Sequence, residues 1–209
     1  ILALPIHQII RFMAKLKSIA EKNAAIIDLG SEKSNVTKAA QQLRLNFVGT
    51  HPLAGSEKKG AEYSLETLFD NSCVILTPTK KTSPQALGKV RKFWTGLNAK
   101  VTVLPPDLHD TILAHTSHLP HAVAFSLMNT IPKKYLSFAA TGLKDATRIA
   151  LSDASLWADI LSYNRKHVLR SITRFQRALG EMKHALERKH PQRLVSILHN
   201  AQRKRQTIS

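Results

Sequence analysis

The chain has 209 residues, of which 43% are hydrophobic and 22% are charged, and this balance is typical of a folded globular protein. Its formal net charge is +17, because 31 Lys and Arg stand against 14 Asp and Glu, and such an excess favours polyanionic partners such as nucleic acid. No apolar run reaches the roughly 18 residues of a membrane span, and a single cysteine excludes an internal disulfide. We therefore expect a protein of the reducing cytoplasm with no membrane association.

The first half of the chain alternates short apolar runs with amphipathic segments. Strands are predicted at residues 1–5, 24–30, 46–49, 73–79 and 100–105. Helices are predicted at residues 7–20, from an N-cap at Ser31 to about Leu43, and from Ser83 to Leu97. Continuous apolar strands separated by helices indicate an α/β layer with a mostly parallel sheet. The sequence contains no GxGxxG motif.

The strand pattern stops near residue 105, and the rest of the chain is predicted to be helical. We place a domain boundary there, between residues 1–105 and 106–209. Apolar residues at spacings of mostly three, four or seven form a stripe from Leu156 to Leu186. A long helix with this stripe needs a partner helix, from the same chain or from a second copy. From Arg165 onward twelve Lys and Arg stand against two Glu, which leaves +10, and a solvated helix face is the common explanation.

Residues that directly follow strands carry the most functional weight, because ligands of open α/β sheets bind at the carboxyl ends of the strands. The segment 50–57 is the richest, since it combines a histidine, a glycine, a hydroxyl and a carboxylate. The candidates from these positions are Pro5, Ser31, Lys33, His51, Ser56 and Glu57.

Four of the ten histidines fall within residues 109–121, in HDTILAHTSHLPH. Zinc needs three or four ligands in compact geometry. Pro120 disturbs a simple helix between His118 and His121, no cysteine lies nearby, and Asp110 is the single acid of the segment. We therefore expect no metal site. The rings with an expected structural role are His109, His115 and His118.

Four segments stand in one order along the chain: DLGSEK (28–33), GTHPLAGSEKKGAE (49–62), HDTILAHTSHLPH (109–121) and TGLKDATRIALSD (141–153). Together they resemble the prephenate/arogenate dehydrogenase family of tyrosine biosynthesis, over nearly the whole chain. The resemblance implies the C-terminal part of a Rossmann-like nucleotide-binding domain, followed by an all-α helical dimerisation domain that forms a homodimer. It also implies oxidative decarboxylation of prephenate to 4-hydroxyphenylpyruvate, or of arogenate to tyrosine, with NAD or NADP as cofactor.

The resemblance also implies roles for individual residues. His51 is the motif histidine and our candidate for the general base, since an unperturbed histidine titrates near pH 6.5. Ser31 is expected to hydrogen-bond His51, the substrate hydroxyl or the nicotinamide, and we also assign Ser31 and Pro5 to cofactor binding. Ser56 and Glu57 are expected to line the substrate site.

The helical half is expected to supply the remaining substrate contacts. Arg148 is the candidate anchor for a substrate carboxylate, because a guanidinium pairs with it in bidentate fashion. Asp145 lies three residues earlier and is expected to hold the Arg148 side chain in place. The resemblance gives His121 a polar or cationic contact to the substrate, and Lys33 is expected to add positive potential.

Two other functions stay open at this point. The charge of the chain would suit a basic nucleic-acid-binding protein, although no nucleic-acid motif is present and aromatic residues make up only 6% of the chain. The missing glycine motif would suit an inactive, truncated relative that persists as a helical dimerisation module.

Overall fold

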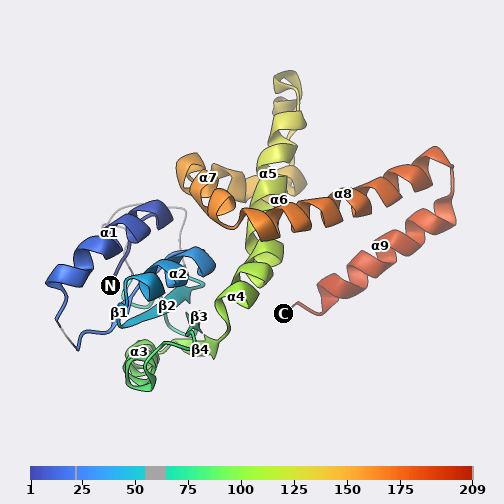
Figure 1. The fold of residues 1–209 in the computed structure, drawn as a ribbon. Helices are drawn as coiled ribbons and strands as arrows, with labels where there is room; N and C mark the ends of the chain where they lie inside the picture. Colours follow the sequence, from blue (N-terminus) through green and yellow to red (C-terminus); the bar gives the residue numbers. More distant parts are fainter. Residues whose placement is uncertain (22, 55–64, 209) are drawn as a thin grey trace. The chain divides into compact units, whose positions relative to one another are not determined.

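The structure, a computed structural model, describes residues 1–21, 23–54 and 65–208, and these divide into two compact units, Ile1–Val168 and Leu169–Ser209 (Figure 1). The strands are β1 (Ile26–Ile27), β2 (Phe47–Pro52), β3 (Cys73–Thr77) and β4 (Lys100–Val103). The α-helices are α1 (Ile6–Ile19), α2 (Ser34–Gln42), α3 (Pro84–Gly96), α4 (Pro106–Leu113), α5 (Leu119–Thr130), α6 (Thr141–Thr147), α7 (Ala154–Tyr163), α8 (Arg165–Glu187) and α9 (Pro191–Gln206). A π-helical turn, η2 (Ala114–His118), joins α4 to α5, and two 3₁₀ segments are η3 (Lys133–Phe138) and η4 (Arg148–Leu151).

The four strands form one mixed sheet in the order β1-β2-β3-β4. The pairs β1–β2 and β3–β4 are parallel, and the central pair β2–β3 is antiparallel, with His51 opposite Ile75. The predicted α/β fold is confirmed, but the sheet reverses direction at its centre. The carboxyl ends of β1 and β2 therefore lie at one edge of the sheet, and those of β3 and β4 lie at the opposite edge.

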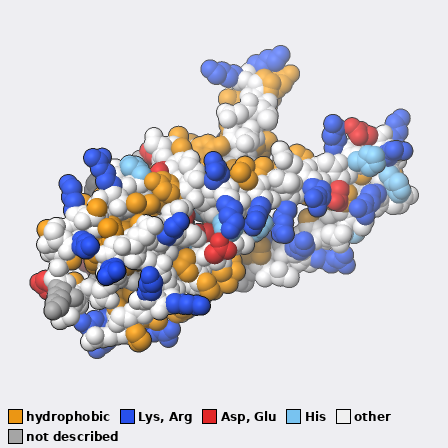
Figure 2. All heavy atoms as spheres, in the orientation of Figure 1, with side chains coloured by type: hydrophobic (Ala, Val, Ile, Leu, Met, Phe, Trp, Pro, Cys, Tyr) orange, Lys and Arg blue, Asp and Glu red, His pale blue; other side chains and the backbone are white. Residues whose placement is uncertain are grey.

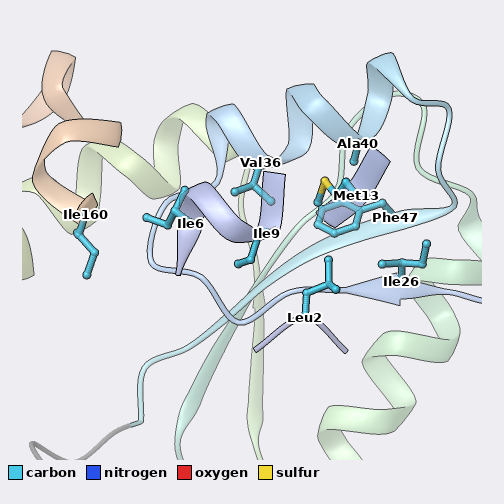
Figure 3. Packing of buried hydrophobic residues seen from close by; sticks show 9 residues of the cluster. All are labelled: Leu2, Ile6, Ile9, Met13, Ile26, Val36, Ala40, Phe47 and Ile160. Carbon is cyan, nitrogen blue, oxygen red and sulfur yellow. The ribbon is translucent and has the colours of Figure 1, made fainter. Parts of the chain in front are cut away.

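The two faces of the sheet bury different helices, because successive strand residues point to opposite sides. Ile26 and Phe47 face α1 and α2, in a cluster that Figure 3 shows from close by. Ile27 and Val48 face the other way and pack against α3. The members of the first cluster are Leu2, Ile6, Ile9, Met13, Ile26, Val36, Ala40, Phe47 and Ile160. The sheet is therefore a central layer, and β2 is packed on both of its faces.

Two expectations for the N-terminal elements are wrong. Of the predicted strand 1–5, only Leu2 pairs, in an isolated parallel bridge to Asp28. The predicted cap at Ser31 also fails, because α2 begins at Ser34 and its N-cap residue is Lys33, whose side chain makes no capping hydrogen bond. The helix predicted from Ser83 to Leu97 is confirmed as α3, and the Ser83 side chain accepts a hydrogen bond from the amide of Ala86 at its start.

Among the helices that follow β4 in the first unit, α4 and α7 contact the sheet layer and the helices that cover it. Ile160 of α7 joins the cluster formed by α1 and α2 (Figure 3). The apolar stripe predicted from Leu156 to Leu186 does not lie on one helix, because the chain breaks at Asn164 between α7 and α8. The compact units divide at Val168, so the boundary at residue 105 stays a prediction about domains.

The second unit consists of most of α8 and all of α9. Within it, Arg193 of α9 forms an ion pair with Glu181 of α8 at 3.7 Å. Leucines on both helices remain exposed, and Leu179 keeps 55% of its surface. Lys and Arg side chains are scattered over the face seen in Figure 2, with few acidic ones among them. Within the described residues, no helix has the length and apolar character needed to cross a membrane.

A candidate active site at the carboxyl end of β2

The last residues of β2 carry the candidate base. His51 is the fifth residue of the strand and retains only 8% of its surface. Burial lowers the pKa of His51 well below its ordinary value, and the neighbouring His109 and Lys33 lower it further. His51 is therefore a neutral imidazole at neutral pH, which is the form that accepts a proton.

A chain of hydrogen bonds runs from His51 into α4. Nδ1 of His51 lies 2.8 Å from Nε2 of His109, and Nδ1 of His109 lies 2.8 Å from Oδ1 of Asp110. The His109 and Asp110 side chains are almost completely buried. Burial also lowers the pKa of His109, against the effect of Asp110. Sequence reasoning assigned His109 a structural role, whereas the structure places it in direct contact with the candidate base.

The start of α2 is capped by side chains other than Ser31. The carboxylate of Asp110 accepts hydrogen bonds from the amides of Lys33 (2.9 Å) and Ser34 (2.8 Å), and Glu32 accepts one from the amide of Asn35 (2.7 Å). These bonds satisfy amides that a helix leaves without partners at its first turn. Ser31 is thereby left on the cavity side of the helix start.

Glu32 is a buried carboxyl group. Burial and the nearby Asp110 raise its pKa to about 8, although hydrogen bonds from Asn35 oppose the shift. Glu32 is therefore protonated at neutral pH when the protein is folded.

Lys33 is fully buried beneath the site. Its ammonium group pairs with the carboxylate of Asp28 and donates a hydrogen bond to the carbonyl of Thr50 at 2.8 Å. Asp28 also accepts from the amides of Gly30 (2.9 Å) and Thr50 (3.2 Å). Lys33 therefore ties the ends of β1 and β2 together, and it acts on His51 through its charge.

A cavity of about 630 Å³ opens beside His51. Its walls include four of the predicted residues, Ser31, His51, His121 and Arg148. Residues from the sheet edge and from the helical elements thus face one volume, and that volume suits a small organic substrate. The cavity brings together a neutral base, a hydroxyl and a guanidinium.

His121 is held in place by an aromatic partner that sequence reasoning missed. Its ring stacks on Trp157 of α7, with a centroid distance of 3.3 Å and an interplanar angle of 16°. Its Nδ1 lies 2.9 Å from the carbonyl oxygen of Ser117 and donates to it, so Nε2 is the acceptor. Burial lowers the pKa of His121, and Arg148 also lowers it. In the sequence, Trp157 belonged to no motif that would single it out from ordinary core residues.

A second cavity, of about 590 Å³, lies at the start of α1. Leu4, Pro5 and Leu29 form an apolar part of its wall. It shares Asp153 and Leu156 with the first cavity, so the two are adjacent. Pro5, predicted on the cofactor side, thus lies beside the cavity that contains His51.

Three predicted residues remain. Ser56 and Glu57 belong to residues 55–64, outside the described part of the chain. Asp145 lies exposed on α6, and the structure does not place it among the residues lining the cavity. Within the described residues, no group of three or more His, Cys, Asp or Glu side chains has a metal-holding arrangement.

Two family models match consecutive parts of the chain. Residues 1–103 match the family model "Prephenate dehydrogenase, nucleotide-binding domain", and residues 105–200 match "Prephenate dehydrogenase, dimerization domain". The chain is 34% identical to a prephenate dehydrogenase of Bacillus subtilis over 96% of its own residues, and it spans 57% of that relative's length.

Two solved structures have the same fold over 99% of the chain. The prephenate dehydrogenase of A. aeolicus, in complex with hydroxyphenyl propionate and NAD+, gives a TM-score of 0.94 with 36% identity, and the chain covers 75% of it. The arogenate dehydrogenase of Synechocystis gives 0.87 with 26% identity, and the chain covers 77% of it. Both parts of the chain thus match the same group of enzymes, and the chain belongs to the prephenate dehydrogenase family.

Proposed function

We propose that this chain carries the reacting groups of an NAD(P)-dependent dehydrogenase that converts prephenate to 4-hydroxyphenylpyruvate. The observation that carries the proposal is the position of His51, a buried neutral ring in the wall of a cavity that also contains Ser31, His121 and Arg148. Family membership and the match to an enzyme solved with NAD+ support it.

The reaction balances without a net proton. The ring carbon of prephenate that bears the hydroxyl loses a hydride, and the hydroxyl loses its proton as it becomes a carbonyl. The ring carboxylate then leaves as CO2, and its electron pair makes the ring aromatic. The new phenolate oxygen takes the proton back. A base beside the hydroxyl therefore has to hold one proton and return it, which suits a neutral histidine.

The residues of the cavity supply this chemistry. We assign the transient proton to Nε2 of His51, because Nδ1 is engaged with His109. Ser31 faces the same cavity and is positioned to hydrogen-bond the substrate hydroxyl. Arg148 supplies the cation for a substrate carboxylate, and His121 offers a second polar contact. Trp157 forms an apolar wall of the cavity that excludes water from the ring of the substrate.

We place the nicotinamide end of the cofactor in the neighbouring cavity. A planar ring fits the apolar wall formed by Leu4, Pro5 and Leu29, and the carboxylates of Asp153 and Asp159 in the same wall suit the positive charge of the oxidised ring. When bound, this group accepts the hydride. Ser155 provides a hydroxyl in the same wall.

The test is an assay of the intact gene product with prephenate and NAD+ or NADP+, followed at 340 nm. We expect turnover with at least one cofactor, and His51→Asn should lower kcat at least about 100-fold. His115→Asn makes the same change on an exposed ring of η2 and should leave kcat within a factor of two. Normal turnover in His51→Asn would refute the assignment of the base.

Arogenate is the second candidate substrate, since one of the matched structures is an arogenate dehydrogenase. Arogenate carries an amino group where prephenate has the side-chain ketone, and its reacting ring is the same. The site as described serves either ring. Parallel kcat/KM measurements decide between them, and no turnover with either substrate and either cofactor would reject the proposed function.

We also propose that the protein is a homodimer formed through its helical region. The match to a dimerization-domain model and the exposed leucines of α8 and α9 support this. Light scattering should give twice the chain mass for the wild type. Leu179→Lys should shift the species towards the monomer, and Arg174→Ala, at an exposed polar position of α8, should not. A monomeric wild type would overturn the assembly without affecting the catalytic assignment.

A further inference from the structure

His51, His109 and Asp110 form a buried chain of hydrogen bonds, the relay. His51 is its outer end, and the carboxylate of Asp110 is its inner end. The carboxylate of Asp110 accepts hydrogen bonds from the ring of His109 on one side and from the amides of Lys33 and Ser34 on the other, at 2.8 to 2.9 Å. Burial alone would raise the pKa of Asp110, but the hydrogen bonds from His109, Ser34 and Lys33 outweigh it and lower the pKa to about 2. Asp110 is therefore ionised at neutral pH and can only accept hydrogen bonds.

This ionised end determines where every proton of the relay lies. Nδ1 of His109 must carry a hydrogen, because it faces a pure acceptor at 2.8 Å. The neutral His109 ring then has an unprotonated Nε2, which accepts. Nδ1 of His51 lies 2.8 Å from that nitrogen and must donate to it. Nε2 of His51 is thereby left with a lone pair.

We propose that His109 and Asp110 are positioning residues that hold His51 in the Nδ1–H tautomer, so that its Nε2 is always the proton acceptor. This inference rests on the proposed function for its catalytic meaning, but the tautomer itself is a property of the protein. When Nε2 takes a proton, the positive ring keeps its Nδ1–H···Nε2 bond to His109, and the charge of Asp110 at the far end of the relay opposes it. The charge of Asp110 thus stabilises the protonated base at a site where burial opposes charge.

Other charged groups around the relay do not determine the tautomer. Lys33 and His118 both lower the pKa of His51, but neither is hydrogen-bonded to its ring. His118 is as deeply buried as His109, and its Nδ1 faces the Nδ2 of Asn164 at 3.0 Å. His118 therefore offers a matched control for His109.

The direct test is ¹⁵N NMR of protein labelled at histidine, which distinguishes a protonated from an unprotonated ring nitrogen. The wild type should show His51 protonated at Nδ1 and not at Nε2 near pH 7. In His109→Phe, which keeps a buried ring but no acceptor, the Nε2–H form of His51 should become populated. His118→Phe should leave the His51 tautomer unchanged. A wild-type His51 that is protonated at Nε2 would overturn the inference whether or not the protein turns over prephenate.

Kinetics then test the catalytic consequence. His109→Phe should lower kcat about 100-fold with KM changed less than threefold, because the wrong tautomer presents N–H to the substrate hydroxyl. The acidic limb of the kcat/KM profile should also move, because protonated His51 loses its hydrogen-bond acceptor. His109→Gln, whose side-chain oxygen can still accept from Nδ1, should recover part of kcat if the variant melts within a few degrees of the wild type. A loss of kcat with an unmoved limb and no rescue would assign His109 a structural role only.

Discussion

Lys33→Met is the most informative single change, because Lys33 holds the only charge opposite Asp28 among the interactions described for that carboxylate. Both side chains are completely buried. Removing one partner of a buried ion pair costs about 3–5 kcal/mol, since the other charge is left without compensation.

The geometry narrows that range. Asp28 keeps its hydrogen bonds from the amides of Gly30 and Thr50, which favours the lower end, about 3 kcal/mol. The carbonyl of Thr50 loses the ammonium donor as well, which adds about 1 kcal/mol. We therefore expect Lys33→Met to lower the free energy of unfolding by about 3–4 kcal/mol, a large part of the total stability of an average domain.

Urea unfolding followed by circular dichroism measures this loss. Lys38→Met makes the same substitution at an exposed position of α2 and should change stability by less than about 0.5 kcal/mol. The double variant Asp28→Asn, Lys33→Met buries no charge and should be more stable than Lys33→Met alone. A loss below about 1 kcal/mol in Lys33→Met, or an equal loss in Lys38→Met, would refute the buried pair.

Three further predictions concern the same unit. Gly49→Ala puts a methyl group 2.3 Å from Oγ1 of Thr77 and should lower the free energy of unfolding by about 1–3 kcal/mol. The control Gly88→Ala has open space in α3 and should raise the free energy of unfolding by about 0.5–1 kcal/mol. A raised melting temperature in Gly49→Ala would contradict the close packing at this position. Glu32 has its pKa raised from 4.5 to about 8, so the folded state keeps a proton that the unfolded chain releases, and stability should fall as pH rises from about 4.5 to 8. Glu32→Gln should remove that fall, by on the order of a few kcal/mol at pH 8, and identical pH dependence in both proteins would refute it. Arg148→Lys should raise KM for prephenate at least about tenfold with a smaller change in kcat, and a KM within twofold of the wild type would reject the carboxylate anchor.

The sequence predicted a helix or strand well where the residues of that element alone determine its pattern. The strands that became β2, β3 and β4 were found from apolar runs, and the helix predicted from Ser83 to Leu97 lies within one residue of α3 at each end. The direction of β3 was not visible, because pairing depends on how the chain turns between β2 and β3 and not on the residues of either strand. The break at Asn164 was also missed; the Asn164 side chain donates a buried hydrogen bond to the carbonyl of Asp110, a partner 54 residues away that local spacing does not indicate.

The same distinction applies to the site. His51, Ser31, His121 and Arg148 came from a resemblance, and the structure brings them to one cavity. The residues alone could not indicate the contacts between segments that are distant in the sequence. Ser31 looked like a cap because nothing local competes for that role, yet the cap comes from Asp110, 76 residues beyond Ser34. His109 looked structural because its partner lies 58 residues earlier.

The π-helical turn η2 makes the angular register of the histidines depend on a single residue. In an unbroken α-helix His109 and His121 would point about 120° apart around the axis, since twelve residues advance by roughly 100° each. A π turn takes up about one extra residue and cancels about 100° of that advance, so the two rings return to within about 20° of the same side. Losing one residue from 114–118 would leave the two helices continuous but rotate His121 away from the side that faces β2. Length in this segment is therefore as restrictive as side-chain identity, which is the opposite of what a surface loop tolerates.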